Sequence, residues 1–226
     1  MTTTRPANPP AVPGPPFRLP DIPQKHPDDM TSVKYLHETG QSHHLSQYLG
    51  NRDTTLVTAE RYVMPVPAYV ANESRYPDLL VAFNVDPAAY EARNGYVVSE
   101  QGKAPDFILE VASRRTASDD LEGKKDYYER LGVDEYWLFD SAGEFYRFTL
   151  AGYRLEENGY QPTEVREIRP GVMQGYSAAL NLNLRAEDGY LGWHDPATGE
   201  HIPTLQSQTA RVQELEAELR RLREGG

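Results

Sequence analysis

Three charged side chains stand out because they lie within or beside segments that otherwise look buried. Asp78 lies at the start of the apolar run 77–84 (PDLLVAFN), and Glu110 lies in the middle of another, residues 106–112 (DFILEVA). Lys124 belongs to the helical segment that follows. A buried charge costs free energy unless it is paired or binds an ion. These residues are therefore the first candidates for chemistry.

Together the three side chains are sufficient for metal-assisted phosphodiester hydrolysis. Two carboxylates on neighbouring strands can hold Mg²⁺ or Mn²⁺, which prefer oxygen ligands. Such an ion offsets the charge of a phosphate and activates a water molecule for attack. A lysine beside the ion can orient that water or stabilise the transition state. Asp106 alternates onto the same strand face as Glu110 and is a further candidate ligand.

Each of these residues also has a purely structural interpretation. Glu110 and Lys124 could form a buried salt bridge with each other. The stem of Lys124 could instead run along the sheet and bring its charge to solvent. Asp78 and Asp106 both follow a proline, where an aspartate often caps a turn.

The segment that must position these groups reads as strand, helix, strand. Residues 106–112 and 134–140 (DEYWLFD) are apolar runs of strand length, and helical periodicity covers residues 119–131 between them. Such a unit predicts two parallel strands with a right-handed connection.

Within the predicted helix, Lys124 lies within about 30° of the centre of the apolar stripe. The stripe consists of Leu121, Tyr128 and Leu131. Asp119 and Glu122 have the spacing of a capping box that would begin the helix. Lys124 is therefore expected on the buried side of the helix, facing the sheet.

The rest of the chain predicts further short elements. A short helix around Leu45 is expected within residues 31–49. The predicted strands and the final turn are residues 54–63, 77–84, 144–149, 152–156, 177–184 and 190–194, and the turn 195–199.

Composition excludes several classes of protein. The 226 residues contain no cysteine, so a disulfide framework, a zinc–thiolate site and a cysteine nucleophile are excluded. The net charge of -11 argues against broad, non-specific phosphate binding, but a metal-dependent nuclease site must itself be acidic. No apolar leader or long apolar stretch occurs, so we expect a cytoplasmic protein without membrane association.

Three parts of the chain differ in composition. Residues 1–29 are proline-rich and are expected to form an extended or disordered tail. Residues 30–205 are expected to form the folded domain. Residues 206–226 predict a charged, coiled-coil-like helix, which could pack on the domain, and a homodimer could form through the core or through this helix. Its heptad positions are Val212, Leu215, Leu219 and Leu222.

The central segment resembles the Uma-two family of restriction-endonuclease-like proteins, within the PD-(D/E)XK nuclease superfamily. The positions that carry this resemblance are Pro77-Asp78, Pro105-Asp106, Glu110-Val111-Ala112-Ser113, Asp120, Lys124, Tyr128, Gly132-Val133 and Glu135 to Asp140. It implies an α/β fold with a mixed β-sheet core, flanking helices and a β meander, and a DNA endonuclease that uses Mg²⁺ or Mn²⁺.

The resemblance also implies roles for particular residues. Asp78 and Glu110 correspond to metal ligands on adjacent core strands. In the wider superfamily the lysine lies two residues after the glutamate, where this chain has Ala112. The family supplies the lysine from the following helix, and Lys124 matches that position. The first helix lacks an obvious acidic residue, the nearest being Glu38, so a third ligand is missing or comes from Asp106 or water.

Residues around this trio are candidates for supporting roles. Asp120 precedes Lys124 by one helical turn and could hold its ammonium group, and Tyr128, one turn later, could do the same. Ser113 belongs to the matching motif. Arg114 and Arg115 could contact the phosphate backbone of DNA, or could simply be exposed.

Three functions remain open on these grounds. The first is a metal-dependent DNA endonuclease. The second is a catalytically inactive nuclease-fold module for binding or assembly, which the acidic charge and the leucine-spaced C-terminus favour. The third is a phosphoesterase that acts on a small substrate.

Overall fold

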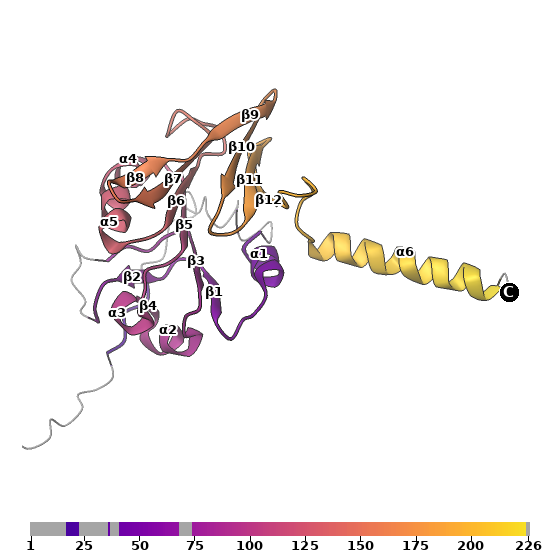
Figure 1. Ribbon diagram of the computed structural model, residues 1–226, viewed down its shortest axis with the longest axis horizontal. Helices are drawn as coiled ribbons and strands as arrows, with labels where there is room; N and C mark the ends of the chain where they lie inside the picture. Colours follow the sequence, from indigo (N-terminus) through magenta and orange to yellow (C-terminus); the bar gives the residue numbers. More distant parts are fainter. Residues whose placement is uncertain (1–16, 23–35, 37–40, 68–73, 225–226) are drawn as a thin grey trace, which may run out of the picture.

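The computed structural model describes residues 17–22, 36, 41–67 and 74–224. Figure 1 shows a body of strands and helices from which one long helix extends. The helices are α1 (Gln41–Leu49), α2 (Pro87–Arg93), α3 (Val98–Gln101), α4 (Ala117–Leu121), α5 (Gly123–Leu131) and α6 (Leu205–Glu224). The strands are β1 (Thr55–Thr58), β2 (Tyr62–Met64), β3 (Leu79–Phe83), β4 (Gly95–Val97), β5 (Phe107–Val111), β6 (Glu135–Phe139), β7 (Leu150–Glu156), β8 (Gly159–Pro162), β9 (Val165–Arg169), β10 (Val172–Ser177), β11 (Leu182–Glu187) and β12 (Tyr190–His194).

A six-stranded mixed sheet forms the centre of the body. Its strand order is β1-β3-β5-β6-β7-β8. β5 and β6 are parallel, as the strand–helix–strand pattern predicted, and the other neighbours in this sheet are antiparallel. Both central strands are buried along their whole length, which explains their nearly continuous apolar sequences.

Two smaller sheets complete the body. β12, β11, β10 and β9 form a four-stranded antiparallel sheet, and β2 pairs with β4 in parallel. In Figure 1 the four-stranded sheet lies beside one face of the central sheet, and α4 and α5 lie on the other face of the central sheet.

The alternation of side chains along β3 and β5 divides the core into two layers. Leu79 and Leu109 pack with Trp193 of the four-stranded sheet. Leu80 and Ile108 point to the opposite face, where they pack in the cluster that contains the α5 residues Tyr127 and Tyr128. Glu110 has the same parity as Ile108, so it belongs to the face covered by α5.

Trp137 of β6 joins the two larger sheets through close contact with two glycines. A Cβ added at Gly152 of β7 would lie 2.8 Å from the Trp137 ring, and one added at Gly175 of β10 would lie 2.7 Å from it. Real Cβ atoms do not approach other heavy atoms so closely. The ring therefore fills the space that side chains at these two positions would need.

The single helix predicted over residues 119–131 is interrupted. Glu122 has φ -124° and ψ -77°, which are not helical angles, and it separates α4 from α5. Asp119 lies inside α4 and does not form the predicted cap. A Cβ at Gly123 would lie 2.2 Å from Asp119 Oδ1, so a larger residue here would require the Asp119 side chain to move.

The prediction of a strand over residues 144–149 is wrong. The carboxylate of Asp140 accepts hydrogen bonds from four backbone N–H groups, which fold this stretch into turns before β7 begins at Leu150. The donors are Ala142, Gly143, Phe145 and Tyr146. A buried acid therefore replaces the strand pairing that the aromatic residues suggested.

The strand predicted over residues 54–63 is two strands that belong to different sheets. Glu60, which lies between β1 and β2, has φ +53° and turns the chain. The predicted strand 177–184 spans the end of β10, a turn and the start of β11, whereas 190–194 matches β12.

Part of the proline-rich segment packs on the body. Leu19 is buried with Met64 and Val97 of the two-stranded sheet, and its N–H donates to the Arg93 carbonyl at 2.9 Å. The rest of residues 1–29, apart from 17–22, lies outside the described residues. Among the described helices, none is both long and apolar enough to span a membrane.

Candidate active site

Asp78 and Glu110 face each other across two antiparallel strands. β3 and β5 pair with Leu79 opposite Leu109 and Leu80 opposite Ile108. Extending this register by one residue places Asp78 opposite Glu110, a relationship in which Cβ atoms are typically about 5 Å apart. Asp78 Oδ2 accepts a hydrogen bond from Val111 N–H at 2.8 Å, which fixes that carboxylate beside the end of β5.

Lys124 reaches this acidic pair from α5. Its Nζ lies 2.8 Å from Glu110 Oε2 and 2.8 Å from Asp120 Oδ1. Glu110 is fully buried, while Asp78 and Lys124 are 7% and 8% exposed. The three predicted catalytic residues therefore gather on one face of the sheet, and two of them retain a small contact with solvent.

Asp120 is held more firmly than its place in the sequence suggested. Its Oδ2 accepts hydrogen bonds from Thr116 Oγ1 at 2.8 Å and Tyr146 OH at 2.7 Å, and its backbone carbonyl accepts one from Tyr136 OH at 2.8 Å. Sequence reasoning missed Tyr146, because it lies in the stretch that looked like a strand. The turn around Asp140 brings it to the site.

The electrostatics of the cluster follow from burial and from the neighbouring charges. Burial raises the pKa of Glu110 above its ordinary value; the ammonium group of Lys124 opposes this effect, and Asp78 and Asp120 reinforce it. Burial by itself lowers the pKa of Lys124, but the charges of Glu110, Asp120 and Asp78 outweigh it and raise that pKa. Lys124 therefore remains an ammonium group at neutral pH.

Other predicted residues surround this cluster. Tyr128 OH donates to Glu110 Oε1 at 3.0 Å. Ser113 Oγ lies 2.9 Å from Thr116 Oγ1, the hydroxyl group that donates a hydrogen bond to Asp120. Arg114 and Arg115 follow β5 and are exposed.

The structure does not bring Asp106 to the other acids. It precedes the opposite end of β5, four residues from Glu110, or about 13 Å along a strand. Its Oδ1 lies 2.6 Å from Lys103 Nζ, and its Oδ2 accepts a hydrogen bond from Phe83 N–H at 2.8 Å. This is the environment of an aspartate that ties two strand ends together.

The first described helix does not supply a further carboxylate. α1 (QSHHLSQYL) contains no acidic residue, and its Leu45 packs in the core layer on the face of the sheet opposite Glu110. Glu38, the nearest acid in the sequence, lies outside the described residues.

The donor set suits a hard cation that keeps most of its water. Asp78 and Glu110 offer carboxylate oxygens, and Mg²⁺ is commonly held by one or two carboxylates together with substrate phosphate. Among the described residues, no group of three or more acidic or histidine side chains is arranged to hold a metal ion. If such a cation were bound here, Asp78, which is 7% exposed, and the buried Glu110 would hold it, and substrate and water would supply its remaining ligands.

A mixed sheet with flanking helices, with Asp78 just before β3 and Glu110 within β5, is the architecture of a restriction-endonuclease-like α/β protein. The model of the Uma2 family, described as "Putative restriction endonuclease", matches residues 26–185. The chain belongs to this family, as its central motifs predicted.

Among solved structures, the chain is similar to a protein from Anabaena variabilis ATCC 29413 described as "a putative nuclease belonging to DUF820". The two sequences are 14% identical, the match covers 66% of this chain and 75% of that chain, and the TM-score is 0.40. No curated protein matches the chain.

Proposed function

We propose that this chain is a cytoplasmic, metal-dependent DNA endonuclease whose catalytic domain is residues 30–205. Asp78 and Glu110 hold Mg²⁺ or Mn²⁺, and Lys124 stabilises the transition state or orients the attacking water. The observation that carries the proposal is the convergence of these three side chains, from two strands and a helix, on one face of the central sheet.

The chemistry that a bound Mg²⁺ supplies at such a site is neutralisation of phosphate charge and activation of water. Hydrolysis forms a bond between the water oxygen and phosphorus and breaks one phosphorus–oxygen ester bond, and the leaving oxygen takes up a proton. Lys124 keeps its proton, because the surrounding carboxylates raise its pKa. It therefore acts by its charge and its hydrogen bonds, and not as a general base.

The neighbouring residues position these groups. Val111 N–H orients Asp78, Tyr128 orients Glu110, and Asp120 holds Lys124. The exposed Arg114 and Arg115 lie just after the strand that carries Glu110, where they could bind the DNA backbone.

Cleavage of supercoiled plasmid by the full chain tests this function. We expect nicking with Mg²⁺ or Mn²⁺, and its loss in Asp78→Asn and Glu110→Gln. Asp126→Asn is the matched control, because Asp126 is an exposed carboxylate of α5, and this variant should nick at the wild-type rate. All variants must keep the wild-type circular dichroism spectrum.

Two results would contradict the proposal. One is the absence of cleavage on double-stranded and single-stranded DNA with either metal. The other is cleavage that survives in both folded carboxylate variants, since it would have to arise elsewhere.

One observation favours a catalytically inactive module for binding or assembly instead. Glu110 is fully buried, Oε2 is paired with Lys124, and Oε1 accepts from Tyr128, so the pair also has the form of a structural salt bridge. Calorimetric titration with MnCl₂ separates the two functions. An inactive module gives no binding heat, whereas the nuclease gives binding that Asp78→Asn abolishes.

A further inference from the structure

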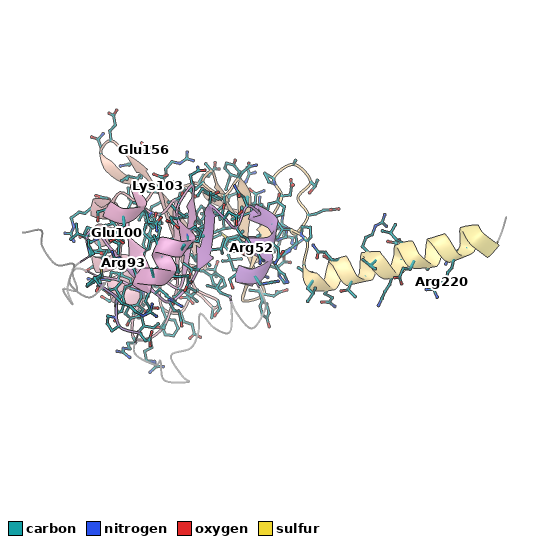
Figure 2. All side chains as sticks on the ribbon, turned by 90° about the horizontal axis from the view of Figure 1, so that it is seen from below. Arg52, Arg93, Glu100, Lys103, Glu156 and Arg220 are labelled. Atoms are coloured by element: carbon teal, nitrogen blue, oxygen red, sulfur yellow. The ribbon has the colours of Figure 1, made fainter. Side chains whose placement is uncertain are left out.

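The C-terminal helix α6 carries an apolar stripe that the body does not cover. Every residue from Leu205 to Glu216 is exposed, and Val212 and Leu215 are 54% and 42% exposed. Figures 1 and 2, which view the molecule from two perpendicular directions, both show α6 extending away from the body. Its contact with the body is near its start, where Leu205 N–H donates to His44 Nε2 at 3.3 Å.

The sequence of α6 places this stripe in a heptad pattern. Val212 and Leu219 occupy a positions, and Leu215 and Leu222 occupy d positions. In the first of these heptads, Val212 at a with Leu215 at d is the combination that favours two-stranded coiled coils. Most helical stability in proteins comes from packing of an apolar face, so a partner for this stripe would also stabilise the 20-residue helix.

The charges beside the stripe distinguish the orientation of that partner. Arg211 and Glu218 occupy g positions, and Glu216 and Arg223 occupy e positions. In a parallel pair, a g residue lies next to the following e residue of the other helix. Arg211 then lies next to Glu216 of the partner subunit. This contact is attractive, and symmetry repeats it.

An antiparallel pair of these helices would bring like charges together. In the register that overlaps all four heptad residues, Val212 lies level with Leu222 of the partner subunit. Residues at e positions then lie next to e positions of the other helix, so Glu216 lies beside Glu216 of the partner subunit. Like charges at these positions oppose association.

We propose that α6 binds α6 of a second copy of this chain as a parallel, two-stranded coiled coil. The pair buries the exposed stripe and forms the Arg211–Glu216 contacts. Both bodies then lie at the same, N-terminal end of the coil. This assembly does not depend on the proposed nuclease activity.

Sedimentation analysis of the full chain tests the assembly. We expect a reversible dimer at micromolar concentration, and a monomer for Leu215→Glu. Gln213→Glu adds the same charge at an exposed b position and should remain dimeric. Because Leu215 is exposed, its replacement should leave the unfolding of the body unchanged.

Disulfide cross-linking through an introduced cysteine tests the orientation of the two helices. The chain has no cysteine of its own, so no other disulfide can form. Gln208 occupies a d position near the start of α6. In the parallel pair, Gln208→Cys places two thiols at the same level of the coil, within reach of a disulfide. In the antiparallel register the two sites are about 27 Å apart along the axis. We therefore expect a disulfide-linked dimer on a non-reducing gel.

Charge exchange tests the contacts themselves. Arg211→Glu should weaken dimerisation about tenfold, because two attractive contacts become repulsive and the Arg211–Glu214 ion pair within each helix is lost. Adding Glu216→Arg should restore the affinity to within about threefold.

Three results would overturn the proposal: a monomeric wild-type chain, a Leu215→Glu variant that still forms dimers, or a dimer in which Gln208→Cys does not cross-link.

Discussion

The Nζ atom of Lys124 lies 2.8 Å from Glu110 Oε2 in the buried layer between α5 and the central sheet. The helix thus delivers its positive charge to the middle of an otherwise apolar strand. Asp120 Oδ1 lies at the same distance from this ammonium group. Three charges therefore share a site that is almost removed from water, and the consequences for stability can be measured.

Removing the cation should destabilise the fold strongly. Lys124→Met leaves Glu110 and Asp120 buried without a counter-charge, and we expect a loss of about 3–5 kcal/mol in the free energy of unfolding. Urea denaturation followed by the fluorescence of Trp137 and Trp193 measures this loss. Lys125→Met is the matched control on the same helix, with an expected cost of about 1 kcal/mol or less, because Lys125 lies over the Tyr153 ring.

Replacing both Lys124 and Glu110 should reduce the free energy of unfolding by less than the sum of the losses in the two single variants. The double variant Lys124→Met with Glu110→Gln lacks one of the two uncompensated charges, so we expect it to recover about half of the loss caused by Lys124→Met. Additive effects of the two substitutions would show that the ion pair does not couple them.

Tyr146 should stabilise the site through a single hydrogen bond. Its hydroxyl donates to Asp120 Oδ2 at 2.7 Å in a buried environment. A hydrogen bond to a charged group contributes about 1.5–3 kcal/mol, so Tyr146→Phe should lower the free energy of unfolding by that amount. Tyr153→Phe, at a partly exposed tyrosine, is the control and should change stability by less than about 0.5 kcal/mol. Equal effects of both variants would contradict this role.

The contact of Trp137 with Gly175 should tolerate no added methyl group. Gly175→Ala places a Cβ against the buried ring, and overpacking of this kind costs about 1–3 kcal/mol. Combining it with Trp137→Phe frees space, so the double variant should lose less stability than the sum of the two single variants. Thermal unfolding of the four proteins measures this coupling. Strict additivity would show that the two sheets do not meet through this ring.

His194 should make the fold less stable in mild acid. Burial, aided by Arg185, lowers the pKa of His194 to about 4, whereas an unfolded histidine has a pKa of about 6.5. The unfolded state therefore binds the proton first as the pH falls, and stability is lost progressively from about pH 6.5 towards pH 4.

Replacing His194 should reduce the dependence of the free energy of unfolding on pH. Between pH 7 and pH 5 we expect His194→Gln to lose about 1 kcal/mol less than the wild type, an amount that allows for solvent screening at this half-buried group. Urea midpoints at the two pH values measure the difference. An unchanged pH dependence in His194→Gln would refute the prediction.

The sequence by itself determined the parallel strands around Glu110, the family, and the buried side of the helix that carries Lys124. These features depend on local periodicity and on residue types within about 35 positions, so they can be read along the chain. The position of Asp78 opposite Glu110 is different, because it depends on the register between strands that are about 30 residues apart.

Only the tertiary structure decided which of the remaining polar residues join the site. Asp106 and Glu110 alternate onto the same strand face, yet one ties strand ends together and the other meets Lys124. Tyr146 joins Asp120 because Asp140 folds the intervening chain into turns, which no pattern of hydrophobic residues indicated. Hydrogen bonds to buried carboxylates connect residues that are distant in sequence, and their partners are set by the packing of the whole domain.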